Sequence, residues 1–139
     1  VGGGLGTGTS VNIPLPSGSA GPSYRDAFAR IVLPVLDQYA PDWLLVSAGY
    51  DGHAEDPLGG MSLDASDYES MAASLGIAMD RSHTVFLLEG GYNLEAVRES
   101  VTATLNGFAF GSAAIERPET GDPWVDHAVA IDSLFWDLD

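Results

Sequence analysis

Two polar side chains, Asp51 and Tyr92, each follow a short apolar run that is typical of a buried strand. Asp51 comes after residues 43–47, and Tyr92 comes after residues 84–88. Ligands of open α/β sheets bind at the carboxyl ends of the strands, so the spacing predicts that both side chains face one cleft. A carboxylate there can ligate a metal ion or act in catalysis. A turn-capping role for Asp51 and a packing role for Tyr92 are the alternatives.

The residues around these two carry further candidates. His53 lies on the same side of an extended chain as Asp51, so the pair could bind one metal ion. Asp56 and Pro57 then open a turn in the same loop. On the other strand, the glycines at positions 90 and 91 would let the backbone lie against a ligand.

The elements that would position these residues alternate between strand and helix, which predicts an α/β fold. Residues 43–47 and 84–88 are expected to be parallel neighbours in one sheet, with a possible third strand near Val11. Ser66 and Glu69 are interpreted as a capping box, and Pro34 is expected to kink its helix. Apolar periodicity predicts helices over residues 24–39, 67–80, 94–107 and 124–138.

Composition limits the classes of function. The 139 residues allow one domain, expected to span 1–139, and the absence of cysteine excludes disulfides and thiolate metal sites. Twenty acidic residues against five arginines give a formal net charge of −15, which opposes binding to nucleic acid and anionic membrane and attracts cationic ligands. We expect neither a membrane span nor a signal peptide, and a cytoplasmic protein.

Four stretches together resemble the histone deacetylase superfamily, especially its class II-like and bacterial acetylpolyamine or acetoin-utilisation branches. They occur in the family's order and with similar spacing over roughly residues 2–108. They are Gly6-Thr-Gly-Thr-Ser-Val-Asn12-Ile-Pro-Leu-Pro16, the segment from Tyr24 to Pro41, Ser47-Ala-Gly-Tyr-Asp-Gly-His-Ala-Glu-Asp-Pro-Leu-Gly59, and Leu88-Glu-Gly-Gly-Tyr-Asn93. The resemblance implies a partial arginase/deacetylase-type fold, with a parallel sheet flanked by helices and the N-terminal half absent.

The resemblance also implies roles for individual residues. Asp51 would be one of three zinc ligands, and Tyr92 would polarise the acetyl oxygen of an acetyl-lysine or acetylpolyamine substrate. Other positions would line the substrate tunnel or support the site from outside the ligand set. These are Leu58, Gly90 and Gly91 in the tunnel wall and floor, and His53 and Asp56 in support.

Parts of the family's site have no counterpart in the sequence. The family takes its other two zinc ligands from an Asp-x-His pair and its general base from paired histidines, and neither motif occurs here. The chain alone is therefore expected to bind zinc weakly or not at all and to be inactive, although a complete fold would be a hydrolase. The alternative is a catalytically inactive module that self-associates or binds a partner through an unpaired sheet edge, or pairs with a missing N-terminal half.

Overall fold

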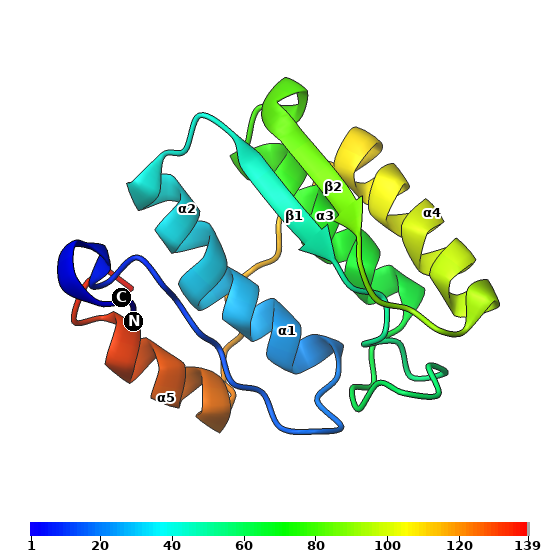
Figure 1. Ribbon diagram of the computed structural model, residues 1–139, viewed down its shortest axis with the longest axis horizontal. Coiled ribbons are helices and arrows are strands. Elements are labelled where there is room, and N and C mark those ends of the chain that lie inside the picture. Colours follow the sequence, from blue (N-terminus) through cyan, green and yellow to red (C-terminus); the bar gives the residue numbers. More distant parts are fainter. Residues whose placement is uncertain (139) are drawn as a thin grey trace.

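The computed structural model describes residues 1–138, and its centre is a two-stranded parallel sheet flanked by helices (Figure 1). β1 (Leu44–Ala48) pairs with β2 (Thr84–Leu88), with Leu44 opposite Thr84. The predicted parallel neighbours are confirmed, with β1 shifted by one residue. The predicted α/β class, with helices beside a parallel sheet, is confirmed as well.

The two faces of the sheet differ in exposure. On one face, Phe86 is half-buried, and its ring packs edge-on against Phe108 with the ring centroids 5.0 Å apart. On the other face, Leu45, Val85 and Leu87 are exposed, Leu45 to 66%. Parallel sheets are usually covered on both sides, as the unbroken apolar runs predict. Within residues 1–138, only one side is covered.

The first long helical segment contains a wide turn. It consists of α1 (Gly21–Ala27), a π turn (Phe28–Val32) and α2 (Leu33–Tyr39). The predicted helix over 24–39 therefore begins earlier, because Pro22 suits the first turn of a helix. Pro34 has no N–H to donate to the carbonyl four residues before it, and the wide turn next to it accommodates that loss.

The helix α3 (Ala65–Ala78) begins at Asp64. The Asp64 carboxylate accepts hydrogen bonds from the N–H groups of Ser66 and Asp67, and Asp67 accepts one in return from the Asp64 N–H at 3.1 Å. The predicted capping box of Ser66 and Glu69 is therefore wrong. An aspartate two residues earlier takes the N-cap position, which places Ser66 in the first turn.

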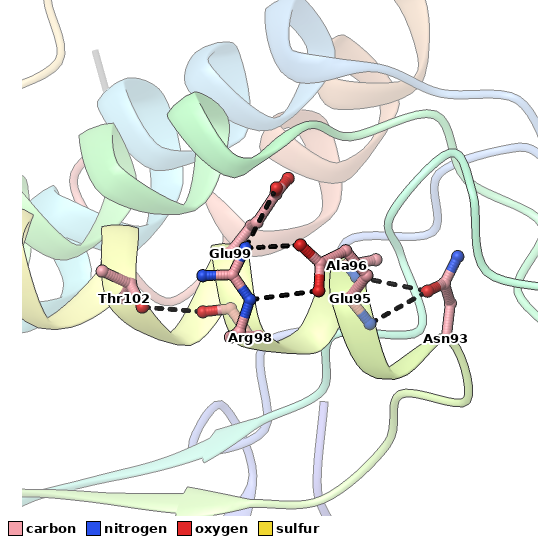
Figure 2. Close-up of polar contacts among 6 residues, drawn as sticks. All are labelled: Asn93, Glu95, Ala96, Arg98, Glu99 and Thr102. Atoms are coloured by element: carbon pink, nitrogen blue, oxygen red, sulfur yellow. Dashed lines mark hydrogen bonds and ion pairs between the residues drawn. The ribbon is translucent and has the colours of Figure 1, made fainter.

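The helix α4 (Leu94–Phe110) begins at Asn93, just beyond Tyr92. The Asn93 side-chain oxygen accepts hydrogen bonds from the N–H groups of Glu95 and Ala96 at 3.1 and 3.3 Å (Figure 2). Arg98 forms an ion pair with Glu95 one turn further along. The cap fixes the point at which the chain leaves the loop that carries Tyr92.

The helices α3 and α4 pack closely through small residues. A Cβ atom added to Gly107 would lie 2.2 Å from the backbone oxygen of Glu69. The buried face of α4 contains Ala96, Ser100, Thr104 and Gly107, whereas Leu94 is 84% exposed and Leu105 is also exposed. The apolar periodicity of this helix marks Leu94 and Leu105 as buried, and the structure contradicts this for both. The two helix backbones approach so closely that only small side chains fit between them.

The helix α5 (Pro123–Asp132) packs against α1 and forms an apolar cluster with it. The cluster includes Ala27, Ile31, Val125 and Ala128. The helix predicted over 124–138 ends early in the structure, because the chain makes turns after Asp132 and then returns to bury Leu138.

Polar contacts of Asp26 and Arg30 also join the first helical segment to the start of α5. Asp26 is buried, and its carboxylate accepts hydrogen bonds from Arg30 at 3.3 Å and from the N–H of Asp122 at 2.6 Å. Arg30 reaches across to Asp126 at 2.6 Å.

The N-terminal segment forms no strand near Val11. Ile13 and Leu15 instead pack onto the apolar cluster between α1 and α5, and the Trp136 indole donates a hydrogen bond to the Gly8 carbonyl at 2.9 Å. The possible third strand is therefore absent from residues 1–138. None of the described helices has the length and hydropathy of a membrane span.

We predict that Gly107→Ala lowers the free energy of unfolding by about 1–3 kcal/mol, because the new methyl group forces α3 and α4 apart. Thermal or urea unfolding of the chain would measure the change. Asn106→Ala is the matched control, since it adds alanine to the exposed side of the same helix and improves helix propensity. Equal stability of Gly107→Ala and the wild type would contradict the close packing.

Candidate functional site

The carboxylate of Asp51 lies against the backbone that follows β2. Pairing of the two strands continues past their ends, because the Glu89 N–H donates to the Ala48 carbonyl at 3.0 Å and the Tyr50 N–H donates to the Gly90 carbonyl at 2.9 Å. A Cβ atom added to Gly90 would lie 2.6 Å from the Asp51 carboxyl carbon. Only a glycine at position 90 therefore leaves room for the carboxylate at this edge of the sheet.

Asp51 contributes the carboxylate of a mainly apolar cleft of about 370 Å³. The wall is formed by parts of β1 and β2, by α1 and the π turn after it, by α3 and α4, and by the loop over residues 49–63. Its larger side chains are Tyr24, Phe28, Val46, Tyr50, Met61, Leu63, Tyr68, Met71, Leu75 and Phe86. A ligand in this cleft would meet one carboxylate among apolar and aromatic groups.

Three tyrosines line the cleft together with Asp51: Tyr24, Tyr50 and Tyr68. Burial raises the pKa of Tyr24, and the Asp51 carboxylate adds to the rise. The pKa of Tyr68 is raised further, mainly by burial and then by the neighbouring Tyr24 and Asp51. The phenols of Tyr24 and Tyr68 are therefore neutral hydrogen-bond donors at neutral pH. The Tyr68 hydroxyl is buried and has no hydrogen-bond partner within residues 1–138.

The loop after β1 is tied to the segment that precedes α1. The Ser62 N–H donates to the Ser19 carbonyl at 2.9 Å, and the Gly60 carbonyl accepts from the Gly18 N–H at 2.6 Å. Gly59 packs against the backbone of Asp51, where an added Cβ would lie 1.6 Å from the carbonyl oxygen. These contacts fix residues 59–62 of the loop beside the cleft, where Gly59, Gly60 and Met61 form part of its wall.

The carboxylate of Asp56 is buried and accepts only backbone N–H groups. One oxygen accepts from Leu58 and Gly59, each at 2.9 Å, and the other accepts from Tyr92 at 2.6 Å. Burial works to raise the pKa of Asp56, but the N–H groups of Tyr92, Leu58 and Gly59 outweigh it and lower the pKa. The group is an anion that fastens two loops together.

The side chain of Tyr92 lies outside the cleft. It is 59% exposed and does not belong to the cleft wall, although its backbone follows β2 at the same edge of the sheet as Asp51. Gly91, just before it, has a φ of +135°, which favours glycine. The structure therefore brings Gly90 against Asp51, while the meeting of the Tyr92 phenol with the Asp51 carboxylate stays a prediction.

His53 is held inside its own loop. Its side chain is buried, and its Nδ1 accepts a hydrogen bond from the Glu55 N–H at 3.1 Å, which places the proton of the neutral ring on Nε2. Its backbone forms an isolated bridge with Leu63. This arrangement suits a residue that supports the loop, and the role of His53 beside a metal site stays a prediction.

Leu58 lies on the outside of the loop and is exposed. Neither Leu58 nor the two glycines at 90 and 91 contributes to the wall of the cleft that contains Asp51. Their assignment to a substrate tunnel stays a prediction.

The residues of the described chain do not form a complete zinc site. Within residues 1–138, no group of three or more histidine or acidic side chains is arranged to hold a metal ion. A catalytic zinc ion takes three protein ligands, and Asp51 supplies one. The described residues alone therefore do not make a catalytic zinc site.

Sequence reasoning missed Tyr24 and Tyr68 as parts of the cleft. Both occur at apolar positions of predicted helices, so the periodicity marked them as ordinary core residues. It also missed the ion pair at 2.6 Å between Arg25 and Asp67, which ties α1 to the start of α3. No signal in one sequence links residues so far apart.

Comparison with known proteins places the chain in a family. The histone deacetylase domain, as a family profile, matches residues 1–108. The chain belongs to the histone deacetylase family. Among curated relatives of that family, "Histone deacetylase 10, chloroplastic" from Oryza sativa subsp. japonica is 42% identical over 111 residues, which are 78% of this chain and 25% of the relative. A "Probable deacetylase" from Archaeoglobus fulgidus is 35% identical over 124 residues, 84% of this chain and 34% of the relative.

Solved structures of histone deacetylases match nearly the whole chain. The HDA15 HD domain aligns over 98% of this chain with a TM-score of 0.83 and 32% identity. The aligned part is 38% of the HDA15 chain. The histone deacetylase Clr3 aligns over 99% with a TM-score of 0.84 and 30% identity, over 24% of its chain. The chain thus spans 25% and 34% of the length of these two curated relatives, and it has the deacetylase fold over the part that it covers.

The lowered pKa of Asp56 predicts an acid-sensitive contribution to stability. The contribution is present above the unfolded-state pKa of about 3.9 and is lost as the pH falls from there through the lower folded-state pKa. The stability difference between wild type and Asp56→Asn should therefore shrink as the pH falls below about 4. Urea unfolding from pH 7 to pH 3 would measure it, and a constant difference would contradict the prediction.

Proposed function

We propose that the chain forms the C-terminal part of the catalytic domain of a zinc-dependent deacetylase that hydrolyses N-acetylated amines, such as acetyl-lysine or an acetylpolyamine. One observation carries the proposal: the Asp51 carboxylate is fixed at the end of β1, against Gly90 at the end of β2. This is the sheet edge at which α/β proteins bind ligands, in a chain that belongs to the deacetylase family.

In a complete fold, Asp51 would be one of the three protein ligands of zinc, and the other two would come from elements outside this chain. Zinc supplies a Lewis acid and an activated water in such sites. Tyr92 would donate its phenolic proton in a hydrogen bond to the acetyl oxygen, where negative charge develops. Leu58, Gly90 and Gly91 would line the approach of the substrate chain, and His53 would keep its loop in shape.

The charge of the chain favours a cationic substrate over an anionic one. Twenty acidic residues attract an acetylpolyamine, which keeps cationic amines, and repel nucleic acid and anionic lipid. The side chain of acetyl-lysine is itself neutral, so for that substrate the attraction would act on neighbouring basic residues. Cytoplasmic localisation stays a prediction, because relatives from Oryza sativa and Arabidopsis thaliana carry the word "chloroplastic" in their names.

We predict that the 139-residue chain alone has negligible deacetylase activity and retains no stoichiometric zinc after purification. One carboxylate holds zinc weakly, and a missing general base costs about 10²–10⁴-fold in rate. A fluorogenic acetyl-lysine assay and metal analysis by mass spectrometry would measure both. Turnover by the isolated chain with one bound zinc would show that His53 or a second subunit supplies ligands.

The same assay on a longer protein that adds the Asp-x-His pair and the paired histidines tests the proposed roles. Asp51→Ala should remove zinc and activity together. Tyr92→Phe should keep zinc and lower kcat by about 10²–10³-fold, because it removes one hydrogen bond made in the transition state. Full activity of Asp51→Ala would overturn the proposal.

A second candidate function is that of a non-catalytic module that associates with itself. The observation in its favour is the open sheet: Leu45, Val85 and Leu87 are exposed on one face, and no third strand pairs with β1 or β2 within residues 1–138. Unpaired strand edges and apolar patches are association surfaces. The negative charge opposes self-association, and salt would weaken that opposition.

If this second function holds, sedimentation velocity should detect oligomers of the isolated chain that increase between 0.05 and 0.5 M NaCl, i.e. as the Debye length falls from roughly 14 to 4 Å. Leu45→Lys should reverse the increase, because it places a charge on the open face. Leu134→Lys is the matched control, since it changes an equally exposed leucine beyond α5. A monomer at every salt concentration would exclude the second function.

A further inference from the structure

Asp56 connects the two loops on which the proposed site depends. Its carboxylate has two oxygens with separate tasks: one accepts the N–H groups of Leu58 and Gly59, and the other accepts the N–H of Tyr92 at 2.6 Å. The first oxygen closes a local turn. The second reaches a residue 36 positions away in the sequence. A purely local turn would need only the first.

The segment around Tyr92 is fastened at three points. The Gly90 carbonyl accepts from the Tyr50 N–H at 2.9 Å, Asp56 holds the Tyr92 N–H, and the Asn93 side-chain amide donates to the Glu55 carbonyl at 3.1 Å. Asn93 also caps α4, as Figure 2 shows. Of these three hydrogen bonds, only the one between the Tyr92 N–H and the Asp56 carboxylate has a charged acceptor.

The Tyr92 phenol has no comparable restraint of its own. The side chain is more than half exposed, and its hydroxyl has no hydrogen-bond partner within residues 1–138. The place from which the phenol reaches the site is therefore set by its backbone. Charged hydrogen bonds are stronger and shorter than neutral ones, so the buried carboxylate is the contact best able to hold that backbone.

We infer that Asp56 is a positioning residue for Tyr92: it holds the Tyr92 backbone where the phenol can meet a substrate bound beside Asp51. The inference rests on the proposed function, because it gives Asp56 a purpose in the same reaction. Asp56 does not touch the substrate in this account. It acts through Tyr92, and it also joins the Asp51 loop to the Tyr92 loop.

Asp56→Asn is the variant that tests the inference. Asparagine has nearly the same shape, but its NH₂ group cannot accept a hydrogen bond, so either Tyr92 or the pair Leu58 and Gly59 loses its partner. In a zinc-loaded longer protein, Asp56→Asn should lower kcat by about 10- to 100-fold with little change in KM and with zinc retained. Asp64→Asn is the matched control, since it removes a carboxylate that caps α3 and does not contact Tyr92.

The double variant separates positioning from a general loss of structure. If Asp56 acts through the Tyr92 phenol, Asp56→Asn should have almost no further effect on kcat in a Tyr92→Phe background. Equal losses in both backgrounds would overturn the inference, because they would show that Asp56 acts on the fold or on Asp51. Loss of zinc in the single variant would overturn it as well.

A measurement on the isolated chain does not depend on activity. Hydrogen exchange followed by NMR should show that the Tyr92 amide is protected in the wild type relative to the amide of Gly60, which donates no hydrogen bond within residues 1–138. Asp56→Asn should increase Tyr92 exchange by at least tenfold while amides within α3 keep their rates. An unprotected Tyr92 amide in the wild type would overturn the inference without any variant.

The two proposals fail in different ways. A longer protein that binds zinc but does not deacetylate any acetylated amine would contradict the proposed function. The hydrogen-exchange measurement on the Tyr92 amide would then still test whether Asp56 holds the Tyr92 backbone. An active protein in which Asp56→Asn behaves like Asp64→Asn would retain the proposed function and end this inference.

Discussion

Parallel pairing of β1 with β2 determines where Asp51 and Gly90 meet and where the Tyr92 loop begins. The strands run side by side in the same direction, and their backbones stay hydrogen-bonded for two residues beyond the sheet. The two loops therefore leave the sheet at the same edge and in contact. The Asp51 carboxylate occupies the space that a side chain at position 90 would need. If the register slipped by one residue, the carboxylate and the glycine would no longer meet.

The helices hold that pairing from one side only. α3 and α4 pack closely through small residues and support the inner face of the sheet through Phe86. α1 is held separately, by the apolar cluster it shares with α5 and by the Arg25–Asp67 contact with the start of α3. The cleft lies where these supports meet the end of β1. The outer face of the sheet has no such support within residues 1–138.

Local patterns in the sequence predicted the elements, and long-range contacts explain most of the differences. The two strands and the helices follow from apolar runs and helical periodicity, and the structure confirms that they exist, with some bounds shifted. Asp64 replaced Ser66 as the cap because two good capping residues lie two positions apart. The buried face of α4 could not be predicted, because it depends on how closely α3 approaches.

For the site, as for the fold, the sequence predicted local features and missed contacts between distant segments. Asp51 was placed correctly at the end of its strand, because a carboxylate after an apolar run is a local signal. The cleft partners Tyr24 and Tyr68 could not be identified, since they come from two helices on either side of the strand. The contact between Asp56 and Tyr92 joins loops that are far apart in the sequence, and no spacing rule connects them.

The interlocking of the two loops constrains any attempt to exchange them with those of a relative. A foreign segment in place of residues 88–93 must keep glycine at position 90 and present a backbone N–H to Asp56. A foreign segment in place of residues 47–59 must in turn bring an acceptor to the Tyr92 amide. Chimeras that transplant only one loop would lose the contacts of Asp56 with the Tyr92 N–H and of Asp51 with Gly90. Engineering of this part of the fold must therefore treat the two segments as one inherited unit.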